Sequence, residues 1–237
     1  MPRTRELPPP PSKPVLSPPV AIAGEENATV AGLAGEPPLE ARVRATPDAT
    51  RAVLLCHPHP LYGGTMHSAV VVAIAKVIAE RDLAVATLRF NYRGVGASGG
   101  SYGAGQGEVL DARAALRALR TRAPKAKVTV CGYSFGTWVG LRAAAIEGGV
   151  ERVALVAPAV RIFDFVREDA AKLGETIAIY LGDEDEFCDV AEARELAVAL
   201  GASLQVFEKS DHYFLAGRRK LAEAIVPFLA PERRDGS

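Results

Sequence analysis

The chain has 237 residues, enough for one domain with a sizeable hydrophobic core. Its 28 lysines and arginines balance its 28 aspartates and glutamates, so it lacks the basic excess that nucleic-acid binding requires, and no nucleic-acid partner is expected. No apolar run is long enough to span a bilayer, and the N-terminal segment lacks a signal-peptide core, so we expect no membrane insertion and a cytoplasmic location.

The first residues of the chain are rich in proline. Proline has no backbone N–H to donate and favours extended, solvated conformations, so residues 1–24 are predicted to form a disordered arm. The folded domain is expected to cover residues 25–237. Near its start, residues 28–33 and 39–45 are separated by the turn sequence AGEPP. They predict an antiparallel pair of strands at the edge of a sheet.

Strand and helix patterns alternate through the rest of the chain. Apolar runs bounded by turn residues predict strands at 51–57, 83–90, 127–133, 150–158, 176–182 and 203–208. Apolar residues at helical spacing predict helices near 70–78, 109–119, 135–146, 190–200 and 221–228. Such repeats predict an α/β fold with a mostly parallel sheet and helices on both faces. Ligands bind such sheets beyond the carboxyl ends of the strands.

A glycine-rich stretch, GVGASG, follows the predicted strand at 83–90 and matches a dinucleotide-binding fingerprint. In that motif the glycine loop opens directly into a helix, and an acidic residue ends a second strand. Here further turn residues follow Gly100, and the helical pattern starts only near Glu108. Asp111, the next acidic residue, falls inside that helix. These features favour an ordinary turn over a dinucleotide site.

The most informative motif is GYSFG, which places Ser134 between a predicted strand and a predicted helix. A serine on this sharp turn has strained backbone angles, and the residues two positions away on either side must be small. Gly132 and Gly136 meet that requirement. The alternative is a serine that only caps an ordinary helix. The motif predicts a nucleophilic serine.

A serine nucleophile needs a histidine base and a carboxylate that orients it, in the chain order serine, acid, histidine. His212 is the only histidine after Ser134, and it follows the last predicted strand. The acid is expected in the loop after residues 176–182. Spacing alone does not choose among the five carboxylates of that loop, which are Asp183, Glu184, Asp185, Glu186 and Asp189.

The sequence HPHPLYGGTMHS follows the first parallel strand, where an acyl-transfer enzyme supplies part of its oxyanion hole. The backbone amides of Phe135 and His59 are the predicted donors. The alternative use of this segment is a zinc site built on His57 and His59, with His67 or a carboxylate as a further ligand. That site lacks a clear third ligand, and no metal is expected.

The three cysteines, Cys56, Cys131 and Cys188, lack metal-ligand spacing and are predicted to be reduced. Cys131 lies three residues before Ser134, which raises the alternative of a thiol nucleophile. A buried strand cysteine that acts as a small hydrophobic side chain is the preferred interpretation.

Together these motifs resemble the α/β-hydrolase superfamily, in particular its small bacterial members with little or no cap, which are related in shape to dienelactone hydrolases. The resemblance covers the chain from about residue 27 onward. It implies Ser134 as nucleophile, His212 as base and Asp185 as acid. It also implies that Arg93, in the glycine-rich loop, braces neighbouring backbone. Dienelactone hydrolases carry cysteine where this chain carries serine, so their substrate is not inherited.

The expected function is hydrolysis of a small-molecule ester or thioester through an acyl-enzyme, without a cofactor. Alternatives are a peptidase or an acyltransferase on the same triad, or a binding domain without catalysis. Only residues 159–175 lie between two predicted strands where larger hydrolases insert a lid, which leaves room for one short helix. We expect part of its apolar segment 162–166 to form one wall of an open, shallow pocket. The oligomeric state is not indicated.

Overall fold

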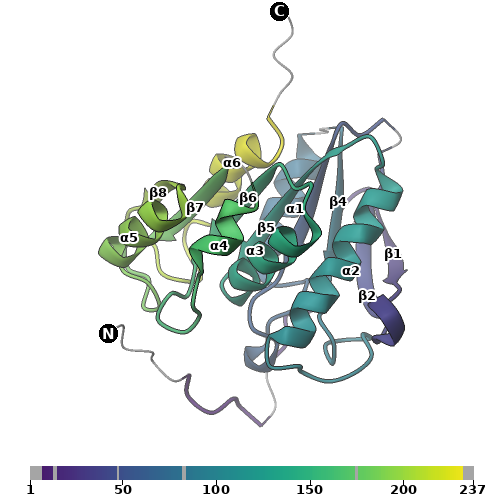
Figure 1. Cartoon of the computed structure of the whole chain (residues 1–237), viewed down its shortest axis with the longest axis horizontal. Coiled ribbons are helices and arrows are strands. Elements are labelled where there is room, and N and C mark those ends of the chain that lie inside the picture. The colour runs from purple at the N-terminus through teal and green to yellow at the C-terminus, as the bar shows by residue number, and fades with distance from the viewer. Residues whose placement is uncertain (1–6, 13–14, 47, 82–83, 174–175, 232–237) are drawn as a thin grey trace, which may run out of the picture.

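The computed structural model describes residues 7–12, 15–46, 48–81, 84–173 and 176–231. One eight-stranded sheet runs through the molecule in the order β1-β2-β4-β3-β5-β6-β7-β8 (Figure 1). The strands are β1 (Glu25–Val30), β2 (Leu39–Arg44), β3 (Arg51–Cys56), β4 (Val85–Phe90), β5 (Lys127–Tyr133), β6 (Arg152–Val156), β7 (Ile177–Gly182) and β8 (Ser203–Phe207).

The sheet is parallel except at one edge. There β2 pairs antiparallel with both β1 and β4, and every other neighbouring pair of strands is parallel. The predicted antiparallel edge pair and the mostly parallel sheet are therefore confirmed. The strands β3 and β5 lie side by side at the centre, so the loops that follow them meet beyond their carboxyl ends.

Helices cover both faces of the sheet. The α-helices are α1 (Ala69–Glu80), α2 (Gln106–Arg122), α3 (Phe135–Glu147), α4 (Arg167–Ala171), α5 (Val190–Leu200) and α6 (Arg218–Leu229), and short 3-10 turns span Leu33–Gly35 and Pro60–Tyr62. Buried side chains of α1 and α6 pack on one face. Those of α2, α3, α4 and α5 pack on the other. Among the residues that the structure describes, no helix has the length and apolar character to cross a membrane.

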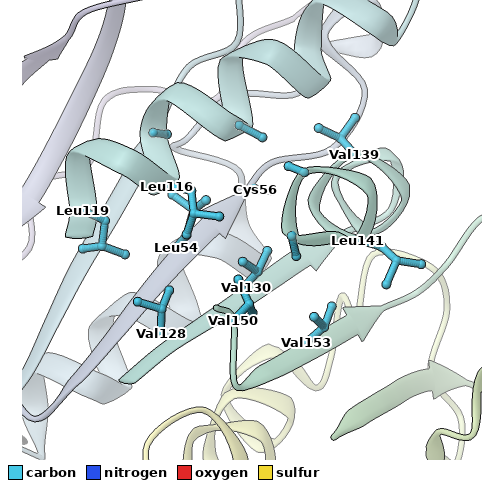
Figure 2. Close-up of a cluster of buried hydrophobic side chains, with 14 of the residues drawn as sticks. Leu54, Cys56, Leu116, Leu119, Val128, Val130, Val139, Leu141, Val150 and Val153 are labelled. Carbon is cyan, nitrogen blue, oxygen red and sulfur yellow. The ribbon is translucent and has the colours of Figure 1, made fainter. Parts of the chain in front are cut away.

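Alternation along the central strand explains why both faces need a cover. Leu54 and Cys56 of β3 belong to the hydrophobic cluster beneath α2 and α3, and Figure 2 labels both in it together with Leu116 of α2. Val53 and Leu55 point into the cluster beneath α1 and α6. Successive side chains of a strand face opposite sides, so an entirely apolar strand requires two hydrophobic layers.

The described part of the segment between β6 and β7 contains a single helix, the five-residue α4. Its Ala170 is buried in the core cluster beneath α3, so α4 closes the edge of the core and leaves little chain for a cap. This agrees with the minimal cap that the length of the segment predicted.

The Pro-rich arm was predicted to be disordered. Its described residues, 7–12 and 15–24, form no helix or strand and run outside the sheet and its helices (Figure 1). Several of them nevertheless contact the domain, two of them just before β1. The Ile22 side chain is buried, and the Val20 N–H donates to His67 Nδ1 at 3.0 Å. The boundary at residue 25 stays a prediction, but the residues just before it pack against the domain.

Candidate active site

Ser134 occupies a sharp turn between β5 and α3. Its backbone angles, φ 54° and ψ −120°, lie in a region that non-glycine residues seldom adopt. A Cβ atom added at Gly132 would lie 2.1 Å from the Gly136 carbonyl oxygen, and one added at Gly136 would lie 2.3 Å from the Cys56 carbonyl oxygen. Both glycines are therefore required for the turn to form, as the sequence predicted.

A chain of two hydrogen bonds links Ser134, His212 and Asp185. Ser134 Oγ lies 2.9 Å from His212 Nε2, and His212 Nδ1 lies 2.8 Å from Asp185 Oδ2. A carboxylate only accepts hydrogen bonds, so Nδ1 carries a proton and Nε2 presents its lone pair to the serine hydroxyl. All three residues are buried. The structure thus brings together Ser134 and His212, which the sequence motifs predicted, and Asp185, which the family resemblance implied.

The loop after β7 separates Asp185 from the carboxylates around it. Asp185 is buried, and its Oδ1 accepts the Phe187 N–H at 2.8 Å. Asp183 is exposed and instead accepts the Ser210 N–H at 3.2 Å. A Cβ atom added at Gly182 would lie 2.1 Å from the Ser210 carbonyl oxygen, so this glycine lets the loops after β7 and β8 approach each other. That approach places the aspartate beside the histidine.

Two backbone amides beside the nucleophile have no protein acceptor among the described residues. They belong to His59, which precedes the 3-10 turn after β3, and to Phe135, the first residue of α3. The side-chain rings of His59 and Phe135 lie close together, with centroids 4.8 Å apart. The start of α3 also packs directly on the end of β3, at the Cys56 carbonyl. Free amides in this position can stabilise an oxyanion.

The three histidines after β3 use their ring nitrogens within the protein. His57 Nδ1–H donates to the Pro58 carbonyl at 2.7 Å, and its Nε2 accepts the Tyr92 N–H at 3.1 Å. His59 Nδ1 accepts the Leu61 N–H at 3.2 Å. His67 Nδ1 likewise accepts a backbone N–H, from the arm. Within the described ranges no three histidine, cysteine or acidic side chains are placed to hold a metal ion.

Burial controls the charge of these imidazoles. It lowers the pKa of His57 to about 3 and that of His59 to about 4. It also lowers the pKa of His67, with the nearby Arg89 charge acting in the same direction. The three rings are therefore neutral near neutral pH, as their hydrogen bonds to backbone groups require.

The cysteines are all buried and unpaired. Burial raises the pKa of Cys56 to about 12 and also raises the pKa values of Cys131 and Cys188. Cys131 packs in the hydrophobic cluster beneath α1 and α6. Because the thiolate is the nucleophilic form, the geometry favours Ser134 over Cys131.

The glycine-rich loop after β4 is a turn. Gly94, Gly96 and Gly100 have positive φ angles, and α2 begins only at Gln106. The Arg93 guanidinium pairs with Asp111 at 2.8 Å and with Glu36 at 2.9 Å. Arg93 therefore ties this loop to α2 and to the chain before β2. Asp111, the acidic residue of the apparent dinucleotide motif, is the partner of Arg93 in an ion pair.

A cavity of about 630 Å³ opens onto Ser134 and His212. Its size is in the range of small-molecule sites. Ile162 and Phe163 contribute one wall, as the sequence analysis expected of this segment. Further apolar lining comes from residues that the sequence analysis missed: Leu7, Val70, Tyr133 and Phe187.

Comparison with known proteins agrees with this geometry. A family model with the description serine aminopeptidase, S33 matches residues 47–165. An uncharacterized protein of Rickettsia prowazekii is 30% identical over 197 residues, which cover 78% of this chain and 81% of the relative. The chain belongs to this family of α/β hydrolases.

Solved structures place this hydrolase among similar folds. An α/β serine hydrolase homologue from Coxiella burnetii is 29% identical, with a TM-score of 0.75, and the match covers 90% of this chain and 100% of the homologue. A serine hydrolase without lid from Xanthomonas campestris is also 29% identical, with a TM-score of 0.71, and the match covers 91% of this chain and 99% of that one. The predicted superfamily and fold are confirmed.

Proposed function

We propose that this hydrolase cleaves carboxylic esters or thioesters of small molecules through an acyl-enzyme. The observation that carries the proposal is the Ser134–His212–Asp185 hydrogen-bond chain, whose serine and histidine line a largely apolar cavity. A serine hydroxyl is a weak nucleophile unless a base removes its proton. Here His212 Nε2 lies within hydrogen-bond distance of the hydroxyl, while its Nδ1 faces the Asp185 carboxylate.

Acylation begins when Ser134 Oγ attacks the substrate carbonyl carbon and His212 Nε2 takes the hydroxyl proton. The negative charge on the carbonyl oxygen is then stabilised by the amides of His59 and Phe135. Asp185 holds the imidazole in place and stabilises its positive charge. When the tetrahedral intermediate collapses, the bond to the alcohol or thiol breaks, and the leaving group takes the proton from His212.

Deacylation repeats these steps with water. His212 Nε2 removes a proton from a water molecule, whose oxygen attacks the acyl carbon. The second tetrahedral intermediate releases the carboxylic acid, and Ser134 Oγ recovers its proton from the imidazole. No redox step occurs, and the proposal requires no cofactor.

A peptidase is the second candidate, because the family description names an aminopeptidase. An aminopeptidase must hold the positively charged amino terminus of its substrate. Glu186 lines the cavity and is exposed, so one carboxylate is available for that task. The neighbouring lining from Ile162, Phe163 and Phe187 is apolar, which favours an ester or thioester with an apolar group. An acyltransferase would use the same triad with an alcohol or thiol in place of water.

The test combines covalent labelling with a substrate panel. We expect a fluorophosphonate probe to label Ser134 in the wild-type protein and to leave the Ser134→Ala variant unlabelled. That variant should lose on the order of 10⁴–10⁶ in kcat for p-nitrophenyl esters, because the nucleophile is gone. Cys131→Ala is the matched control, which should keep most of the activity. Cleavage of aminoacyl p-nitroanilides without cleavage of esters would favour the peptidase.

A further inference from the structure

The cavity in front of Ser134 is bounded in part by a segment far away in the chain. Leu7, Pro8, Val15 and Ser17 of the Pro-rich arm line the same cavity as the serine and histidine of the triad. Between β6 and β7, where larger hydrolases insert a cap, the described residues form one short helix, α4, and the segment lines the cavity through Ala159, Ile162 and Phe163. The arm supplies a further part of the wall.

Two contacts hold the arm against the 3-10 turn after β3. Tyr62 Oη–H donates to the Pro8 carbonyl at 2.5 Å. At Gly63 the φ angle is +84°, and an added Cβ atom would lie 2.6 Å from the Val15 carbonyl oxygen. The close approach of the arm therefore requires glycine at this position. His59, whose amide is a proposed oxyanion donor, directly precedes this turn, so the arm lies against the segment that carries the donor.

A buried ion pair anchors the end of the arm. The Arg89 side chain is fully buried and pairs with Glu25 at 2.6 Å. Its Nη2 also donates to the Val20 carbonyl at 2.6 Å, while the Val20 N–H donates to His67. Both backbone polar groups of Val20 are thus bound to buried side chains, and Ile22 is buried beside them. A buried charge left without its partner is strongly unfavourable, so this anchor is well suited to hold the arm in place.

The composition of the arm suits a pocket wall. Proline carries no N–H donor, so Pro8, one of the four arm residues that line the cavity, adds no unpaired amide to it. Its restricted φ angle also reduces the conformational entropy that is lost when the arm lies against the domain. Leu7, which is half-buried, supplies the apolar side chain.

We propose that the Pro-rich arm serves as the cap of this hydrolase, and that Leu7 limits the length of the apolar group that the substrate places in the cavity. This inference builds on the proposed ester or thioester hydrolysis. Each additional buried methylene improves binding about fourfold. A change at Leu7 should therefore act on long substrates and spare short ones.

Cysteine substitution in the full chain tests this role. The three natural cysteines are buried, so a thiosulfonate reagent should react with an introduced thiol at position 7 or 16. Leu16 is exposed and does not line the cavity, which makes Leu16→Cys the matched control. The modifying group is benzyl, attached through a disulfide that dithiothreitol removes.

Modified Leu7→Cys is expected to lose at least tenfold in kcat/KM for an ester with an eight-carbon chain. The loss should appear mainly in KM, and reduction should restore the rate. Hydrolysis of p-nitrophenyl acetate should change less than threefold. Comparing p-nitrophenyl octanoate with octyl acetate identifies whether the acyl or the alcohol group lies against the arm. Equal effects of modification at positions 7 and 16 on every ester would overturn the proposal.

A second measurement tests whether the arm lies beside the active site and does not depend on substrate hydrolysis. A nitroxide on Leu7→Cys should broaden the imidazole NMR signals of His59 and His212, both of which line the cavity. The control is Ile146→Cys, an exposed site near the far end of α3, about 18 Å along the helix from Ser134. Broadening without any ester hydrolysis by the wild type would reject the proposed function alone. Hydrolysis without broadening would reject the cap.

Discussion

Two loops at the carboxyl ends of the strands carry histidines, and they use them in opposite ways. The loop after β8 presents His212, whose ring nitrogens lie between a serine hydroxyl and a carboxylate. The loop after β3 presents His57, whose ring nitrogens both bind backbone groups. One ring faces reactive side chains, whereas the other joins two stretches of backbone.

The difference shows that burial alone does not make a histidine into a base. Burial of His57 without a carboxylate partner lowers its pKa to about 3, so it cannot hold a proton near neutral pH. His212 is also buried, but Asp185 Oδ2 stands 2.8 Å from its Nδ1 and can stabilise the protonated ring. The group bound to Nδ1 therefore distinguishes the two histidines. It is a carboxylate at His212 and a backbone carbonyl at His57.

The largest expected effect is at His212. The His212→Gln substitution removes the base and should lower kcat for ester hydrolysis on the order of 10⁴–10⁶, as the loss of a triad histidine does elsewhere. The thermal unfolding midpoint should confirm that the variant is folded. Retention of more than about 1% of wild-type kcat would mean that another group acts as the base.

A smaller decrease in kcat is expected when Asp185, the carboxylate partner of His212, is replaced. Asp185→Asn keeps the shape of the side chain but favours the wrong tautomer of His212, so kcat should fall by up to about 10⁴. The matched Asp183→Asn variant removes a charge from an exposed side chain that binds the Ser210 N–H, and it should change kcat less than threefold. If the two variants exchange these effects, Asp183 is the acid.

These two carboxylates also mark where sequence reasoning ended. The succession of strands and helices along the chain and the strand-end positions of Ser134 and His212 follow from local patterns, because apolar runs and turn glycines are visible in the sequence. The acid loop holds five carboxylates within seven residues, and only burial distinguishes Asp185 from its neighbours. Burial depends on how the loops after β7 and β8 pack, which no local pattern reports.

The arm itself was predicted, but its packing against the domain was not, for a related reason. Its contacts with Tyr62 and Arg89 span more than fifty residues of sequence, and proline-rich segments show no periodicity that would predict a docking face. One signal was available. Arg89 is the one charged residue of the mostly apolar strand β4, and a charged residue there requires a buried partner, which is Glu25, the residue that follows the arm and begins β1.

A third prediction concerns the backbone of the loop after β3. The φ angle of His59 is −59°, which proline can adopt. His59→Pro and His59→Ala both remove the imidazole, but only the proline variant removes the N–H that is proposed to bind the oxyanion. We expect kcat for His59→Pro to be about 10²–10³ below that of His59→Ala. Equal kcat values in the two variants would exclude this amide from the oxyanion hole.

The smallest expected effect is on stability, at His57. The unfolded chain protonates this ring near pH 6.5, whereas the folded protein does so only near pH 3. The unfolded state therefore binds more protons between these values, so the stability contributed by the neutral ring is complete above about pH 6.5 and decreases as pH falls. At pH 5 the decrease should be about 2 kcal/mol.

The His57→Gln variant isolates this contribution. Glutamine does not titrate, and its side-chain oxygen can still accept the Tyr92 N–H. Urea unfolding at pH 7.5 and pH 5 should show a smaller loss of unfolding free energy in the variant than in the wild type, by about 2 kcal/mol. The pKa of His59, which burial lowers to about 4, affects both proteins equally and cancels in this comparison. Identical losses in the two proteins would mean that His57 is not the neutral, buried partner of backbone groups that distinguishes this loop from the one that carries His212.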